Sequence, residues 1–443
     1  MRWIWHSPGV AGRLIRGASV ALLVSAAGQA LSFGLQVLFA RELGARGYGG
    51  YSYLMSWLSI GLIVAKWGYD TALLRFVAAY AAKGLPGRVR GVVQTATRQA
   101  CAVGFVVSIP LCAAAWLLAR TDGTSLTGAI VLTGVLVPTG ACSELVAAGV
   151  RGLGQTARSL VGDMMIRPIV AAAALFVSIA VGVEIGAREA HGVYLLGTVI
   201  SLLLSTYFLV QALPWRRELA PRRLRQFWSR SAGLLMVANG FQLLLYSVDV
   251  LMLGSLDGMV SSGLYNVASK LAILVIFIMN AAQSVAGPMM AAAYASARHD
   301  ELNRIVRLFT LVSLVAGLPL AILLGAAAPW VLHAFGPEFE AARGALLVLL
   351  AMQCVNVATG PVGMLLAMTG RQRALAKLLA GGLVLNVVLN TVMIPKFGLM
   401  GAAWSAFVAH SAWNIAGVLH IRKELGIDCS LVTWVSPPLL RRA

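Results

Sequence analysis

Residues 49–80 have the sequence GGYSYLMSWLSIGLIVAKWGYDTALLRFVAAY. Residues 263–294 have a related sequence, GLYNVASKLAILVIFIMNAAQSVAGPMMAAAY. Both contain one long apolar segment that ends in a short alanine-rich run. Three residues recur at an offset of 214: Gly49, Tyr51 and Tyr80 reappear as Gly263, Tyr265 and Tyr294. A second landmark, GQTAR at residues 154–158, matches GRQR at residues 370–373 at an offset of 216. This near-constant spacing predicts a duplicated unit of six helices, and therefore two similar lobes.

The composition places the chain in a lipid bilayer. Hydrophobic residues make up 59% of it and charged residues only 12%, and the mean hydropathy is +0.83. These values are far too apolar for a soluble protein of this length. Since an apolar run of about 20 residues spans the hydrocarbon as a helix, we predict an all-α polytopic membrane protein. The predicted spans are residues 14–40, 51–67, 92–118, 126–150, 164–183, 193–213, 231–254, 262–288, 305–327, 345–368, 376–394 and 401–421.

The basic residues define a topology. The net charge is +19, but with the N-terminus placed in the cytoplasm most Lys and Arg fall in inner loops, as the positive-inside rule requires. Residues 216–230 contain six arginines, and we interpret them as a cytoplasmic linker that contacts anionic lipids. Docking of a protein or nucleic acid there is the less favoured alternative. The predicted organisation is an N-terminal lobe at residues 1–215, this linker, and a C-terminal lobe at residues 231–443 with a cytoplasmic tail.

Polar side chains form a stripe in the first span of each predicted lobe, at steps of three and four residues that keep them on one helix face. The stripes comprise Ser25, Gln29, Ser32 and Gln36 in the first span, and Asn239, Gln242, Tyr246 and Asp249 in the seventh. With one residue of slippage, Gln29 falls opposite Gln242 and Gln36 opposite Asp249. Hydrogen bonding between helices would explain a single stripe, but matched stripes favour a shared polar lumen.

Lys66 and Lys270 lie inside predicted spans. Lys66 is near the inner end of the second span, where it can pair with Asp70 one turn later, so charge pairing is its plainer interpretation. Lys270 lies about 12 Å below the outer surface at 1.5 Å per residue, which is too deep for easy access to water in a core of about 30 Å. An intramembrane cation indicates a functional site. The alternative is that Asp249, on the adjoining helix, neutralises Lys270.

The sequence contains no pattern that predicts catalysis or a bound metal. The five cysteines and six histidines have no spacing suited to a disulfide, a metal site or a Ser/His pair. We therefore expect no enzyme activity and no cofactor. A coupling ion, either a proton or sodium, is left open.

Three motifs join or begin the predicted helices: FARELG at residues 39–44 with YGGY at 48–51, GYDTALLRFVAAY at residues 68–80, and IPKFGLMGAA at residues 394–403. They resemble the polysaccharide-transporter branch of the multidrug/oligosaccharidyl-lipid/polysaccharide (MOP) exporter superfamily, the Wzx-type oligosaccharide flippases. The resemblance extends over both halves of the chain, but its motifs are architectural more than chemical. The candidate cavity residues, with Arg75 of the second motif included, are Lys270, Asp249, Gln29, Gln36, Asn239, Gln242, Lys66 and Arg75.

The resemblance implies a flippase of the bacterial inner membrane that carries an undecaprenyl-diphosphate-linked oligosaccharide from the cytoplasmic to the periplasmic leaflet by alternating access. Such a glycan is an O-antigen, capsule or exopolysaccharide unit. The implied partners are the lipid-linked glycan and membrane lipids, with a polysaccharide polymerase and chain-length proteins as further candidates and no nucleic acid. A sugar head and a diphosphate cannot cross hydrocarbon unaided, so the protein must offer them a hydrated, cationic groove.

Three other classes compete with the flippase. A cation-coupled multidrug exporter of the same superfamily needs intramembrane carboxylates, and Asp249 stands almost alone. A membrane polymerase or ligase would be expected to have a large catalytic outer loop, whereas the longest predicted one spans only residues 328–344. A structural scaffold would not need the matched polar stripes. The exporter is therefore the principal alternative.

Overall fold

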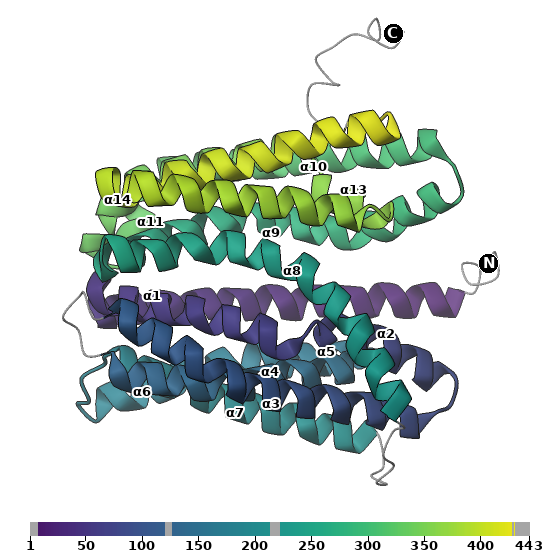
Figure 1. The fold of residues 1–443 in the computed structure, drawn as a ribbon, viewed down its shortest axis with the longest axis horizontal. Helices are drawn as coiled ribbons and strands as arrows, with labels where there is room; N and C mark the ends of the chain where they lie inside the picture. Colours follow the sequence, from purple (N-terminus) through teal and green to yellow (C-terminus); the bar gives the residue numbers. More distant parts are fainter. Residues whose placement is uncertain (1–7, 120–125, 213–221, 428, 430–443) are drawn as a thin grey trace, which may run out of the picture. The chain divides into compact units, whose positions relative to one another are not determined.

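The computed structural model describes residues 8–119, 126–212, 222–427 and 429, and within these ranges every regular element is a helix (Figure 1). Eight of the described helices are long and apolar enough to cross a membrane, by length and composition. The prediction of an all-α polytopic membrane protein is therefore confirmed. The packing of the helices divides the chain into two compact units, Met1–Gly240 and Phe241–Ala443, which we call unit 1 and unit 2.

Unit 1 contains seven α-helices, a π-helical turn and the first part of an eighth α-helix among its described residues. They are α1 (Pro8–Lys66), α2 (Tyr69–Ala82), α3 (Pro86–Ala119), α4 (Thr127–Gly152), α5 (Thr156–Leu160), the π-helical turn η3 (Val161–Ile166), α6 (Arg167–Ala180), α7 (Ala187–Ala212) and α8 (Arg222–Leu256). The division between the units falls at Gly240, inside α8. This helix therefore contributes residues to both units.

Unit 2 contains the rest of α8 and the helices that follow it. They are α9 (Met259–Ala295), α10 (His299–Ala326), α11 (Ala328–His333), the 3₁₀ helix η4 (Pro337–Ala342), α12 (Arg343–Thr359), α13 (Val362–Met368) and α14 (Gln372–Leu425). The stretch at residues 328–344, expected to be an outer loop, folds as the short helices α11 and η4 and the start of α12. It carries no large inserted domain.

Two glycines with non-helical backbone mark sharp kinks inside α1 and α14. Gly44 has φ 64° inside α1, where the first and second predicted spans meet. Gly398 has φ 51° inside α14, between the last two predicted spans. Positive φ is open to glycine at little steric cost, so each residue lets the chain turn sharply between two helical segments. The kinks lie between the predicted spans of each pair, and α1 and α14 each contain two helical segments at those positions.

The predicted linker at residues 216–230 lies partly outside the described residues. From Arg222 onward it is helical and forms the start of α8, nine residues before the predicted beginning of the seventh span at Ser231. Trp228 and Ala232 are fully buried, in the same hydrophobic cluster as residues of α1 to α4 such as Tyr69 and Leu73. The start of α8 is thus a packed part of unit 1.

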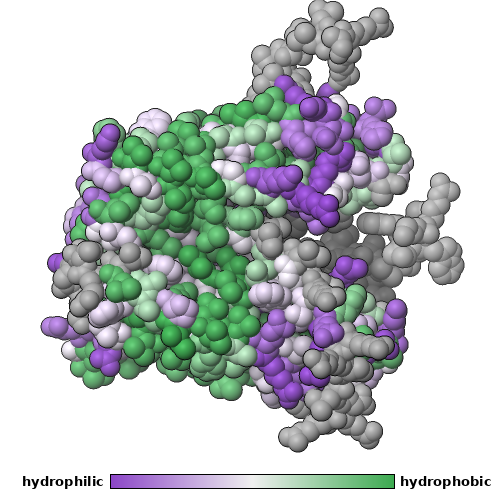
Figure 2. Space-filling view, viewed as in Figure 1, coloured by the Kyte–Doolittle hydropathy of each residue, from purple (hydrophilic) through white to green (hydrophobic). Residues whose placement is uncertain are grey.

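The outward faces of many helices carry large apolar side chains. Ile109 on α3 is 73% exposed, Val315 on α10 is 68% exposed and Leu203 on α7 is 64% exposed. Figure 2 shows broad apolar areas on the visible surface of the described residues, with polar side chains gathered beside them. Soluble proteins rarely expose contiguous apolar areas of this kind, so these faces are suited to contact with lipid.

Candidate functional site

The centre of the site in unit 2 is the carboxylate of Asp249 on α8, which is only 2% exposed. The Tyr265 hydroxyl on α9 donates a hydrogen bond of 2.7 Å to its Oδ2 atom. Asn386 and Asn390 on α14 each donate from Nδ2 to its Oδ1 atom, over 2.9 Å and 2.8 Å. These asparagines are four residues apart and so lie on the same helix face. Three donors from two helices therefore converge on one buried carboxylate.

The α8–α9 hairpin positions Tyr265 for this contact. The Ser262 hydroxyl donates to the carbonyl oxygen of Val250 over 3.0 Å, which ties the start of α9 to α8 one residue beyond Asp249. Tyr265 lies three residues after Ser262, on the same face of α9, and is 2% exposed. The register of the hairpin thus places the tyrosine hydroxyl opposite the carboxylate.

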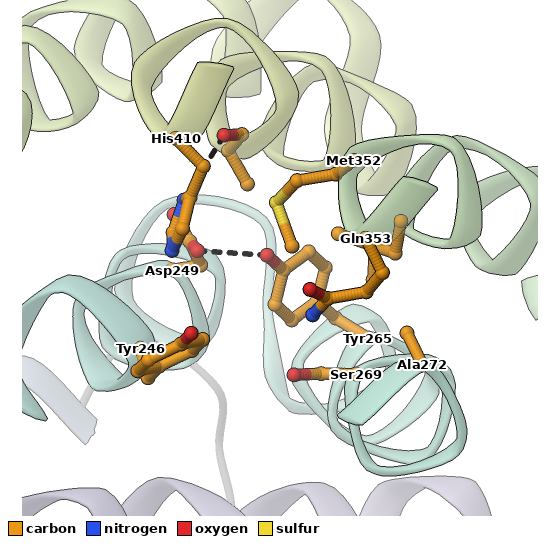
Figure 3. Close-up of a pocket in the computed structure, with 10 residues that line it drawn as sticks. Tyr246, Asp249, Tyr265, Ser269, Ala272, Met352, Gln353 and His410 are labelled. Carbon is orange, nitrogen blue, oxygen red and sulfur yellow. Dashed lines mark hydrogen bonds between the residues drawn. The ribbon is translucent and has the colours of Figure 1, made fainter. Parts of the chain in front are cut away.

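A small cavity of about 10 Å³ adjoins this carboxylate, enough for about one water molecule. Its lining includes Tyr246, Ser269, Gln353 and His410 in addition to Asp249, and Figure 3 shows these side chains converging from α8, α9, α12 and α14. The Nε2 atoms of Gln353 and His410 are buried there without a hydrogen-bond partner. His410 is held by its other ring nitrogen, which lies 3.1 Å from the carbonyl oxygen of Ala406.

This arrangement defines the chemistry available to Asp249. Among the described residues, the carboxylate forms hydrogen bonds but no ion pair. An ionised carboxylate without a cation is costly to bury, and such groups inside a membrane commonly bind a proton or small cation. Asp249 is therefore the group in unit 2 best placed for either.

Unit 1 has a weaker, uncharged counterpart of this site. Gln36, which the sequence aligns with Asp249, accepts a hydrogen bond of 3.4 Å from the Tyr48 hydroxyl. Here too a polar side chain on the first helix of the unit meets a tyrosine that follows it in the chain. His191 on α7 is fully buried with its ring centroid 5.0 Å from that of Tyr51, and its Nε2 atom has no partner. Gln36 cannot carry the negative charge that Asp249 can.

Lys270 is set apart from this cluster. In the described structure it forms no ion pair or hydrogen bond, and the postulated pairing with Asp249 is not found. Its side chain is exposed, whereas every other residue of α9 from Ser262 to Ile276 is buried or half-buried. The helix is therefore enclosed around this stretch except on the side of Lys270, and the ammonium group is available to a ligand.

The remaining predicted site residues occupy different environments. The side chains of Gln29 on α1, Gln242 on α8 and Arg75 on α2 are exposed. Asn239 lies in α8, but its side chain is outside the described part of the structure.

Lys66 lies at the end of α1 in a group of charges within unit 1. Its Nζ atom is 2.7 Å from Oε2 of Glu144 on α4 and 3.4 Å from Oδ2 of Asp70 on α2. The predicted pairing with Asp70 is thus present, and Glu144 adds a second, shorter contact. In the same unit, Arg167 pairs with Asp163 over 2.7 Å. These contacts show how Lys66 is neutralised and do not connect it to Lys270.

Comparison with known proteins identifies the family. The sequence profile described as "Polysaccharide biosynthesis protein" matches residues 14–294, which is more than half of the chain. The chain belongs to this family. A second profile, MatE, matches residues 235–392. A comparison with curated protein sequences finds no match.

Solved transporter structures share the fold. One is an inward-facing conformation of a multidrug resistance MATE family transporter of the MOP superfamily, with a TM-score of 0.73, 16% identity, and coverage of 92% of this chain and 98% of that one. An outward-facing conformation of such a transporter matches with a TM-score of 0.67 and 15% identity, and the match covers 93% of this chain and 95% of that one. A third structure is a MOP superfamily transporter from Pyrococcus furiosus Vc1 (DSM3638), described as having a binding pocket of reverse polarity. It matches with a TM-score of 0.63 and 14% identity, and the match covers 93% of this chain and 95% of that one. Family and fold point to a multi-pass membrane transporter of the MOP superfamily rather than an enzyme.

Proposed function

We propose that this transporter carries a polyprenyl-diphosphate-linked oligosaccharide from the cytoplasmic to the periplasmic leaflet of a bacterial inner membrane. The cargo would be an O-antigen, capsule or exopolysaccharide unit, passed afterwards to a polymerase with its chain-length proteins. Transport would proceed by alternating access, as two lobes at residues 1–215 and 231–443 rock about the linker at residues 216–230. Both termini and the linker would face the cytoplasm. The polysaccharide biosynthesis family supports this assignment over other MOP cargoes.

The observation that carries the proposal is the state of Lys270. It is the exposed residue in a stretch of α9 that is otherwise buried or half-buried, and no described side chain pairs with it. A lysine that only stabilised the fold would be expected to have a carboxylate beside it, as Lys66 has. An unpaired intramembrane ammonium group instead suits an anionic ligand. In the cargo that we propose from the family assignment, the diphosphate is the anionic group.

Exposed amides support the same cargo. Gln29 on α1 and Gln242 on α8 each present both hydrogen-bond donors and an acceptor, which suits the hydroxyl groups of a sugar. In the proposed transporter the ammonium group of Lys270 binds the diphosphate, and Gln242 of the same unit binds the glycan head. The polyprenyl tail has no polar atoms and stays in the lipid.

The test is to remove the protein from a cell that makes the polysaccharide and to follow the lipid-linked oligosaccharide. If the proposal is correct, the completed unit accumulates on the cytoplasmic face and polymer on the cell surface is lost, while drug sensitivity is unchanged. Continued arrival of the unit in the periplasm, with increased sensitivity to cationic drugs, would contradict it.

The second candidate is a cation-coupled exporter of small molecules, and the specific observation that favours it is Asp249. A buried carboxylate beside a cavity for one water is suited to binding a coupling ion. This group could drive either function, so it does not by itself select the cargo. The candidates separate on substrate: an exporter should move a cationic dye in proteoliposomes, whereas the proposed flippase should move the lipid-linked glycan and leave the dye in place.

A further inference from the structure

The first part of α8, residues 222–240, is packed on unit 1 although the rest of the helix belongs to unit 2. We call residues 222–240 the docking segment. Its contacts lie at the junction between α1 and α2 and on the neighbouring faces of α2 and α3. These contacts combine specific hydrogen bonds with close approach of backbones.

Hydrogen bonds fix the register of the docking segment. Trp228 Nε1 donates to the Tyr80 hydroxyl of α2 over 3.0 Å, and the indole of Trp228 is fully buried. Trp67 Nε1 donates to the carbonyl oxygen of Ser229 over 3.2 Å, while Gln99 Nε2 of α3 donates to the Ser229 hydroxyl over the same distance. A shift of the segment by one residue would break all three bonds.

A glycine at the helix junction allows the backbones to meet. Gly68 has φ 74°, and a Cβ atom placed there would collide with the carbonyl oxygen of Ala232 and lie 2.7 Å from the backbone nitrogen of Met236. Any side chain at Gly68 would therefore push the docking segment away. On the segment, a Cβ atom on Gly233 would lie 2.9 Å from Trp67 Nε1, so both partners are shaped for this contact.

The junction also contains a strained residue. Trp67 has φ 50°, a left-handed conformation that is unfavourable for a bulky side chain. Residues in such conformations persist where the surrounding structure holds them, and they cluster at switch regions. Here the docking segment supplies a hydrogen bond that holds the Trp67 side chain. Release of the segment would allow Trp67 to relax.

We propose that the docking segment is a releasable latch, closed on the α1–α2 junction in this structure and opened during the transport cycle. The inference rests on the proposed rocking of two lobes. A helix shared by two units cannot keep both sets of contacts when the units move, so it must bend or one part must detach. The docking segment buries Trp228 and Ala232 in the hydrophobic cluster of unit 1, its hydrogen bonds and glycine contacts lie at one junction, and Gly240 at the unit boundary lowers the cost of bending.

The latch can be tested by closing it covalently. Gln99→Cys and Ser229→Cys, in a background without the native cysteines, place two thiols where the side chains now meet. A bifunctional methanethiosulfonate reagent should bridge them and slow movement of the lipid-linked oligosaccharide in proteoliposomes at least tenfold, and a reductant should restore the rate. The matched control is Arg371→Cys with Glu424→Cys, a contacting pair confined to unit 2, whose bridge should leave the rate unchanged. Full transport by the bridged Gln99→Cys/Ser229→Cys protein would contradict the proposal that the docking segment is released during transport.

A second measurement needs no substrate. Gly68→Ala should lower the bridging rate between the same two cysteines several-fold without lowering the amount of protein in the membrane, because the added methyl group displaces the docking segment. An unchanged bridging rate would show that the junction does not hold the segment. If the unbridged protein moves no lipid-linked oligosaccharide, the proposed function fails, and this bridging rate still decides whether the docking segment is held as we infer.

Discussion

Replacement of Asp249 by leucine should destabilise unit 2 severely, whereas replacement by asparagine should be tolerated. Leucine leaves the donors of Tyr265, Asn386 and Asn390 buried without an acceptor. An orphaned buried donor costs about 1–3 kcal/mol, so three of them amount to at least about 3 kcal/mol even at the lower limit. Asparagine keeps the shape of the side chain and offers one oxygen to the two amides and its own amide to the tyrosine oxygen. Weaker hydrogen bonds are then offset by the lower cost of burying a neutral group, and the net change should be within about 1 kcal/mol.

The assay is thermal unfolding of the purified protein in detergent, followed by tryptophan fluorescence, together with the amount of protein in the membrane. Gln36→Leu is the matched control, because Gln36 is the aligned position in unit 1 and accepts one long hydrogen bond of 3.4 Å. We expect the unfolding temperature to fall far more for Asp249→Leu than for Asp249→Asn or Gln36→Leu. Equal stability of Asp249→Leu and the unaltered protein would refute the assignment of this carboxylate as the centre of the polar cluster.

Three further outcomes are expected. A cysteine that replaces the exposed Gln242 should react with a water-soluble thiol reagent. A cysteine that replaces Leu245, which is 1% exposed on the same helix, should not react. Equal protection of the two cysteines would place Gln242 against lipid. Loss of the Lys66 side chain in Lys66→Ala should lower the unfolding temperature more than Glu144→Gln, because the first change leaves two carboxylates unpaired and the second leaves Asp70 as a partner. These side chains are only 16–31% exposed, and removing one partner of a largely buried pair leaves a costly uncompensated charge. The reverse order would show that pairing is not the role of Lys66. A cysteine at Arg223 should be labelled from the cytoplasm only, and labelling from outside would overturn the predicted topology.

The sequence predicted the fold because its dominant constraint is simple. Apolar runs long enough to cross a bilayer must be helical, and the motif around Gly44 and the one around Gly398 marked the turns between spans. What could not be predicted was the helical start of α8 at Arg222. Six arginines suggested a linker, but Trp228 in the same stretch packs into the core of unit 1.

The candidate site was predicted less completely. Asp249 and Lys270 were singled out, but their depths in adjoining helices suggested a pairing that the structure does not contain. Depth along a helix does not specify the direction in which a side chain points, and the partners of Asp249 come from α14, far away in sequence. The spacing of four between Asn386 and Asn390 places both amides on one face of α14, but nothing in the sequence indicates that this face meets Asp249. Nothing in the sequence marked His410, whose place beside the cavity depends on tertiary packing.

The central claim is that Lys270 binds the diphosphate of a lipid-linked oligosaccharide, and the most direct measurement is the rate at which purified protein in proteoliposomes moves that lipid between leaflets. A charge pair at 4 Å contributes about 4 kcal/mol at an effective dielectric of 20, and loss of half of this slows transport more than tenfold, since about 1.4 kcal/mol is a factor of ten. We predict that Lys270→Ala loses at least this much, that Lys270→Arg retains part of the rate, and that Lys396→Ala, which removes an exposed lysine of the same unit, retains all of it. Equal rates for Lys270→Ala and the unaltered protein would contradict the account.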